Sequence, residues 1–323
     1  MALPGAKASG VWDTERVKLN ESDIIRRIRE TFPGGEALTD DCGALPQPPA
    51  GCRMLVTADL MESGQHFRLD WHPPELLGRK LLNVNLSDLD SSGAVPLGFT
   101  LTLALGRDLE VTWLEAFLAG LAQAAHGAGV PVLGGDTVGR DTGLGLGITA
   151  FGAARRWLQR SELRAGDRLF VDQILGRSHR GLRKLQSGQR WDPEHPDADL
   201  AAHLDPRPNL GLGPKLAEIP EVHACIDLSD GLSKDLRMLA EASGLSVVLA
   251  PGLDADQLFG GEDFARCFSS SLSTEELETR LGIPLFQVGE AVPKAEAAVL
   301  IYDEGRPRPL PDQSFDHFAP GTE

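Results

Sequence analysis

The chain has 323 residues, and its 47 acidic and 31 basic side chains give a formal net charge of −16. A surface with this excess of acid repels nucleic-acid phosphates and anionic membranes, which disfavours both as partners. Hydrophobic residues make up 41% and charged residues 24%, which is typical of a globular protein and unlike a disordered chain. Acidity alone is explained by solubility, but a phosphate substrate would need a cation between it and the protein.

The four cysteines are widely spaced and form no Cys-x-x-Cys pair, which argues against a zinc ribbon, a thioredoxin-type site or a disulfide framework. No apolar run approaches the ~18 residues of a membrane span. The first ten residues lack the apolar core of a signal peptide. We therefore expect a soluble, cytoplasmic protein.

In the first half of the chain, strand patterns alternate with helix patterns. A short helix is predicted at 23–31 and a strand at 53–58. The pattern continues with a helix from Pro73-Pro74 to Gly93, a strand at 97–105, a helix at 114–125 ended by Gly127 and Gly129, a strand at 130–133 that runs into Gly134-Gly135-Asp136, and a strand at 143–153.

A polar, basic stretch at 154–166 indicates a boundary, after which the pattern is again mixed. We predict strands at 168–172, 222–228, 246–249, 285–288 and 297–301, a helix at 232–243, and a loop rich in Pro and His at 191–208. The prediction is an α/β (mixed α+β) protein with two domains, residues 1–154 and 155–323.

Familiar phosphate-binding and hydrolase motifs do not account for this chain. Residues 176–181 have the glycines of a P-loop, but Leu182-Arg183 stand where Lys-Ser/Thr is required. The glycines at 145–147 lie inside a strand pattern instead of a strand-to-helix turn, so a dinucleotide fingerprint is not indicated. The chain also lacks G-x-S-x-G and H-E-x-x-H.

Aspartates at expected turns and strand ends are the remaining chemical signal. One of them, Asp88, lies inside an apolar helix pattern, where an ionised side chain is unfavourable unless it is paired or binds metal. Taken singly, Asp227 or Asp230 is explained as a helix N-cap and Asp136 as a turn residue. Taken together, carboxylates at strand ends meet at the edge where α/β proteins bind ligands, and Mg²⁺ takes such oxygens together with substrate phosphates.

At these residues the sequence resembles the thiamine-monophosphate kinase family, which belongs to the aminoimidazole ribonucleotide synthetase-like superfamily. Seven stretches carry the resemblance, in the family's order and from end to end of the chain. They are DDCGAL (40–45), TADLMESGQHF (57–67), GRKLLNVNLSDLDSSGAVP (78–96), GGDT (134–137), IDLSDGLSKDL (226–236), GGEDF (260–264) and FDHF (315–318).

The resemblance implies a two-domain fold, transfer of the γ-phosphoryl of ATP to thiamine monophosphate, and a homodimer formed through the first domain. It assigns several Mg²⁺ ions to Asp40, Thr57, Asp59, Asp88, Asp136, Asp227 and Asp230. It places ATP at Gly135, Asp136, Arg160 and Ser229, and the thiamine phosphate at His66, Glu262 and Phe315.

Such a reaction needs no general base, because the acceptor phosphate is already ionised near pH 7. Catalysis then consists of aligning two anions and neutralising the transferred group, which metal ions do. We therefore expect no catalytic acid–base residue. Among the expected substrate contacts, an aromatic Phe315 suits stacking on a cationic heterocycle.

The chain departs from the family pattern at Thr39, Ala58 and residues 264–266, and its 251–260 loop is short. These departures leave two alternatives open. One is an ATP-using superfamily member with a different acceptor, and the other is a nucleotide- and metal-binding homologue with little turnover. For the implied dimer, the β-rich stretches 97–105 and 143–152 are the expected interface.

Overall fold

The computed structural model describes residues 21–40, 42–303 and 306–311. Its first sheet holds β1 (Arg53–Glu62), β2 (Val95–Gly106), β3 (Val132–Arg140) and β4 (Leu144–Ala154), in the order β1-β4-β2-β3. Only the β2–β3 pair of this sheet is parallel. With α2 (Pro74–Ser91) and α3 (Val111–Ala128), the predicted β-α-β-α-β-β order of this half is confirmed.

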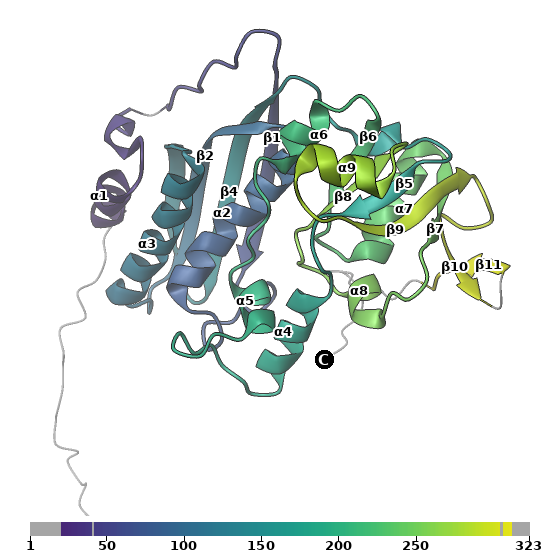
Figure 1. The fold of residues 1–323 in the computed structure, drawn as a ribbon. Coiled ribbons are helices and arrows are strands. Elements are labelled where there is room, and N and C mark those ends of the chain that lie inside the picture. Colours follow the sequence, from purple (N-terminus) through teal and green to yellow (C-terminus); the bar gives the residue numbers. More distant parts are fainter. Residues whose placement is uncertain (1–20, 41, 304–305, 312–323) are drawn as a thin grey trace, which may run out of the picture.

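Helices α2 and α3 lie side by side over one face of this sheet (Figure 1). Apolar side chains of β2 and β4, such as Leu101 and Ile148, are buried beneath them. The helices approach closely because Gly78 lacks a side chain: a Cβ there would lie 2.2 Å from the carbonyl oxygen of Phe117. Helix α1 (Glu21–Thr31) and the 3-10 turn η1 (Gly35–Ala37) pack beside α3 and β3.

Among the described residues, the second sheet has seven strands in the order β11-β10-β7-β9-β5-β8-β6, and only β10 and β7 pair in parallel. Its strands are β5 (Arg168–Val171), β6 (Val222–Asp227), β7 (Leu245–Leu249), β8 (Arg266–Ser270), β9 (Phe286–Pro293), β10 (Val299–Asp303) and β11 (Arg306–Pro309). The helical segments are η2 (Arg160–Glu162), α4 (Arg177–Gln186), α5 (Ala198–Leu204), α6 (Leu212–Ala217), α7 (Leu232–Ser243), α8 (Ala255–Phe259) and α9 (Thr274–Leu281).

The structure corrects several predicted elements. Strands β1 and β3 continue past their expected ends, so Asp59 and Gly134–Asp136 lie within strands and not at turns. The expected loop at 191–208 contains α5. Strand β8 was missed because it is buried on both faces yet carries an arginine and two serines, so it shows no alternating pattern.

The two sheets come from the chain before and after residue 155, although the domain boundary itself stays a prediction. Helix α2 touches β6, α5 and α6 of the second half. A small apolar cluster also joins Leu76 of α2 to Leu185, Leu200 and Leu204. Within the described ranges, no helix is both long and apolar enough to cross a membrane.

Candidate active site

Two acids of the first half meet where α2 crosses β1. The hydroxyl of Thr57 donates a hydrogen bond of 2.6 Å to Oδ2 of Asp88, which lies on an otherwise buried stretch of α2. Asp59 is two residues beyond Thr57 and therefore lies on the same face of the strand. Burial, and secondly the charge of Asp88, raises the pKa of Asp59 to about 6. The predicted grouping of these three residues is thus present in the structure.

Asp227, at the end of β6, brings a third carboxyl group to this point from the second half of the chain. It is only 3% exposed, and its carboxyl group shares a hydrogen bond with that of Asp88. Burial raises the pKa of Asp227 well above its usual range, and the charges of Asp88 and Asp235 add to the effect. Burial likewise raises the pKa of Asp88. Asp59 and Asp227 each place a like charge beside Asp88 when ionised, and this repulsion in a partly buried place favours a bound cation.

The turn after β6 is organised by an acid that the sequence analysis missed. Asp235 of α7 accepts hydrogen bonds of 3.2 Å from the backbone N–H groups of Asp230 and Gly231. Burial, and then the charge of Asp230, raises the pKa of Asp235 to about 7. The N-cap of α7 is Gly231, without a side-chain cap, so the N-cap explanation of Asp227 and Asp230 is wrong. Asp230 instead pairs with Lys234 at 2.9 Å.

Arg160 supplies positive charge to these acids. It lies in η2, and its charge lowers the pKa values of Asp88, Asp227 and Asp235. Its Nη1 atom also lies 3.9 Å from the sulfur of Met238 on α7. An exposed guanidinium group beside the acids is suited to bind a phosphate that a metal ion holds there.

Asp136 does not join this group of acids. Asp40 and Asp136 are both exposed. The strand register aligns Asp59 with Gly135 across β4 and β2, so the side chain of Asp136 points to the opposite face of the sheet. Three strand spacings also separate it from Asp59, a distance of about 14 Å. Their assignment as metal ligands stays a prediction.

The glycine at position 135 has a packing explanation. A Cβ there would lie 2.0 Å from the carbonyl oxygen of Leu101 on β2. A larger residue would therefore separate the two strands. Its contact with ATP stays a prediction.

Glu262 lies in a loop that links the two halves. The backbone of Glu262 has φ 64°, and its N–H donates to the carbonyl oxygen of Ser229, 2.8 Å away. The fully buried ammonium group of Lys80 donates to Glu262 Oε2 at 3.0 Å and to the carbonyl oxygen of His203 at 2.9 Å. Burial by itself would raise the pKa of Glu262, but the charges of Lys80 and His203 outweigh it and hold the pKa below its usual range. Glu262 is therefore a fixed carboxylate.

His66 lies near this carboxylate, since its charge also lowers the pKa of Glu262. The Nδ1 atom of His66 accepts a hydrogen bond from the backbone N–H of Glu62, 3.0 Å away. A neutral His66 therefore carries its proton on Nε2. The third predicted substrate residue, Phe315, lies outside the described residues.

Lys80 and Asp235 were not predicted as site residues, although the helix patterns around them indicate a buried charge. Lys80 falls on the same helix face as Leu77, Leu81 and Val84, and Asp235 falls among Leu232, Leu236 and Leu239. A charge on an apolar helix face is the same signal that singled out Asp88.

The donor set suits a hard cation such as Mg²⁺. Asp59, Asp88 and Asp227 offer carboxylate oxygens, and Thr57 adds a hydroxyl. Burial raises the pKa of each of the three carboxyl groups, because it disfavours the charged form, and a bound cation would offset this cost. In the part of the chain that the structure describes, no three His, Cys, Asp or Glu side chains are grouped closely enough to hold one ion by themselves. Such an ion would be completed by substrate phosphate or water.

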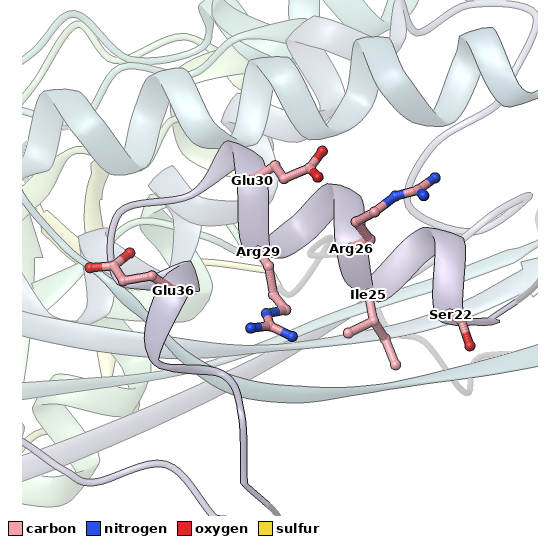
Figure 2. Close-up of a pocket in the computed structure, with 6 residues that line it drawn as sticks. All are labelled: Ser22, Ile25, Arg26, Arg29, Glu30 and Glu36. Carbon is pink, nitrogen blue, oxygen red and sulfur yellow. The ribbon is translucent and has the colours of Figure 1, made fainter.

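Two cavities lie away from these acids. One, of about 480 Å³, is formed by α1 and the turn that follows, and Figure 2 shows its six lining side chains, among them Arg29 and Glu36. The other, of about 500 Å³, lies between α2, α3 and residues 205–211. Neither is lined by a predicted site residue.

Comparison with known proteins identifies the family of this chain. The family described as AIR synthase related protein, N-terminal domain, matches residues 39–154. The thiamine-monophosphate kinase of Escherichia coli K12 is 34% identical over 301 residues, which cover 87% of this chain and 91% of that protein. The chain belongs to the thiamine-monophosphate kinase family. The Salmonella typhimurium enzyme of the same name is also 34% identical, over 92% of this chain and 95% of its own length.

Solved structures of this kinase family share the fold. The thiamine-monophosphate kinase from Stenotrophomonas maltophilia K279a superposes with a TM-score of 0.73 at 29% identity, covering 90% of this chain and 99% of that one. A structure described as AaThiL complexed with AMPPCP and TMP superposes with a TM-score of 0.72 at 25% identity, covering 96% of this chain and all of that one. The predicted two-domain aminoimidazole ribonucleotide synthetase-like fold is thereby confirmed.

Proposed function

We propose that this chain transfers the γ-phosphoryl group of ATP to thiamine monophosphate, giving thiamine diphosphate, in a reaction that requires Mg²⁺. Relatives named thiamine-monophosphate kinase and a related structure bound to AMPPCP and TMP support the substrates. The observation that carries the proposal is that Asp88 of α2 lies beside both Asp59 of β1 and Asp227 of β6.

In this proposal, Asp59, Asp88 and Asp227 hold Mg²⁺, with Thr57 fixing the orientation of Asp88 through its hydrogen bond. Bound Mg²⁺ would neutralise the phosphates and orient the donor and acceptor oxygens. The chain's own residues fix these carboxylates in place, and no general base is needed because the acceptor oxygen is already ionised. Asp40, Asp136 and Asp230 are proposed as additional ligands.

Arg160 and Ser229, with the backbone of Gly135 and the side chain of Asp136, are proposed to contact ATP. On the acceptor side, His66 would donate its Nε2–H to the phosphate. Glu262, fixed by Lys80, would orient the acceptor by accepting hydrogen bonds, because its charge is already balanced. Phe315 is proposed to stack on the thiamine ring. The expected location is the cytoplasm.

We also propose a homodimer formed through the open face of the first sheet. Among the described residues, four large apolar side chains on the strands of this sheet are exposed: Val56 (63%), Leu60 (58%), Val95 (54%) and Val138 (48%). Register places Val56 and Leu60 on the face of β1 opposite to α2, and Val138 lies on the same outer face of β3. Exposed apolar patches on soluble proteins are typical of protein–protein interfaces.

The experiment is to incubate the purified protein with ATP, thiamine monophosphate and Mg²⁺ and to quantify thiamine diphosphate and ADP by chromatography. We expect both products, and none when EDTA replaces Mg²⁺. Asp88→Asn should reduce turnover by about 10² or more, since one well-placed electrostatic group commonly contributes this factor. The matched control is Asp141→Asn, at a side chain that is 99% exposed. ATP binding without product would refute the proposed acceptor, and near-normal turnover of Asp88→Asn would refute the metal assignment.

A further inference from the structure

A buried ion pair joins the two halves of the chain just behind the acids of the site. The guanidinium group of Arg266 on β8 donates from Nε to Oδ2 of Asp90 on α2, 2.8 Å away, and the two side chains are 0% and 2% exposed. Asp90 also accepts hydrogen bonds from the backbone N–H groups of Gly211 and Gly213 at the start of α6. The pair therefore ties α2, β8 and α6 together.

Arg266 pairs with Asp90 although it also lies beside Asp227. Arg266 is the direct cross-strand partner of Asp227 in the β6–β8 ladder. Directly opposed residues on antiparallel strands point to the same face, with Cβ atoms about 4.5–5.5 Å apart. The charge of Arg266 lowers the pKa of Asp227, which also places the two groups close together. Asp227 is thus within reach of a guanidinium group that nevertheless pairs elsewhere.

Arg266 also retains hydrogen-bonding capacity toward a second acceptor. Its Nη1 donates to the carbonyl oxygen of Phe264, 3.0 Å away, and its Nε to Asp90. Its Nη2 is buried and, among the described residues, has no hydrogen-bond partner. A guanidinium group binds a carboxylate best through two parallel N–H groups, so Arg266 would pair with Asp227 if Asp90 did not hold it.

We propose that Asp90 is a positioning residue that keeps Arg266 paired away from Asp227 and so leaves the Asp227 carboxylate available to a divalent cation. A guanidinium group bound to Asp227 would occupy the oxygens that a metal ion needs and would place a like charge beside that ion. The inference rests on the proposed Mg²⁺ site. It assigns Asp90 no contact with substrate or metal.

The decisive change is Asp90→Asn, which keeps the volume and an oxygen acceptor for α6 but removes the charge that holds Arg266. We expect Mg²⁺ affinity to fall about tenfold. In this variant Mg²⁺ competes with a hydrogen bond from Arg266 to Asp227, and one charge-assisted hydrogen bond corresponds to about this factor in affinity. In the double variant Asp90→Asn/Arg266→Leu the competing cation is gone. Its Mg²⁺ affinity should return to within about twofold of the unchanged protein.

The measurement is calorimetric titration of the full chain with MgCl₂ alone, without ATP or acceptor, accompanied by thermal unfolding of each variant. A purely structural role would lower the melting temperature of Asp90→Asn and leave its Mg²⁺ affinity unchanged, which would overturn the inference. Failure of the double variant to regain affinity would overturn it as well. Asp227→Asn is measured in parallel: if that change leaves Mg²⁺ binding intact, the metal site itself is wrong, and the inference falls with it.

Asp90→Asn alone leaves a buried charge without its partner, which is the kind of change that can prevent folding. The double variant removes both charges and is expected to fold, since a buried ion pair is often replaced by uncharged residues without loss of stability. If only the double variant folds, Mg²⁺ affinity within twofold of the unchanged protein supports the inference. A tenfold loss of Mg²⁺ affinity in the double variant would show that the charge of Arg266 itself supports the site, and this result would overturn the inference.

Discussion

Asp235 offers a test of the electrostatics of the site that does not depend on activity. Its carboxyl group is fully buried, and its pKa is raised from 3.8 to about 7. The folded protein therefore holds this proton more tightly than the unfolded chain does. Its contribution to stability is complete below about pH 4, is lost as the pH rises toward 7, and changes little above that.

The magnitude follows from the same pKa difference. At 1.36 kcal/mol per pKa unit, ionising Asp235 in the folded protein lowers the free energy of unfolding by about 4 kcal/mol between pH 4 and pH 8. Asp235→Asn keeps an oxygen that accepts from the N–H groups of Asp230 and Gly231 and has no proton to lose. We therefore expect the variant to be more stable than the unchanged protein at pH 8 and similar to it at pH 4.

The assay is urea unfolding followed by fluorescence at pH 4, 6 and 8, with EDTA present so that metal binding does not contribute. The stability difference between Asp235→Asn and the unchanged protein should grow with pH by up to about 4 kcal/mol. Asp141→Asn, at an exposed position, should show no such trend. Parallel pH curves for Asp235→Asn and the unchanged protein would refute the assignment of a raised pKa to this buried group.

Three further outcomes are expected. Lys80→Met should raise the KM for thiamine monophosphate about tenfold and leave the KM for ATP within twofold, because Lys80 fixes Glu262; equal increases in steady-state kinetics would contradict this role. Gly78→Ala should lower the free energy of unfolding by about 1–3 kcal/mol in urea, since its Cβ would meet the α3 backbone. Gly127→Ala, where nothing lies within 4 Å, is its control and should not destabilise. Val56→Glu should shift sedimentation from dimer toward monomer; an unchanged sedimentation profile would contradict the proposed interface.

Much of the first half of the fold could be predicted because its elements have regular periodicity. The helix predicted from Pro74 and the strand predicted at 97–105 are present as α2 and β2 with nearly the expected bounds. Asp88 was identifiable for the same reason, since a charge on an apolar helix requires a partner, and it has one in Thr57. The helix pattern of the sequence and the burial of α2 in the structure therefore both single out Asp88.

Long-range placement was less accessible from the sequence. Asp136 was expected at a turn, but the strand continues, and the alternation of side chains turns Asp136 away from Asp59. Strand β8 has no alternating pattern, and with it the partner of Asp90 escaped notice. Which strand lies beside which is decided by the packing of distant segments, so neither the Arg266–Asp227 pairing nor the orientation of Asp136 has a local signal.

At the contact between the two halves, acidic side chains affect how the halves pack as well as the charge of the surface. Asp88 comes from α2 and Asp227 from β6, so packing the two halves together forces like charges into one partly buried place. The charges of Arg160 and Arg266 lower the pKa of Asp227, but burial, and secondly the charge of Asp88, raises it well above its usual range. A cation that binds here therefore stabilises the packing of the halves as well as the substrate phosphates, because a ligand of the folded state adds its binding energy to the stability of that state. If the proposed Mg²⁺ site is correct, activity and the packing of the two halves depend on the same carboxyl groups, Asp88 of α2 and Asp227 of β6.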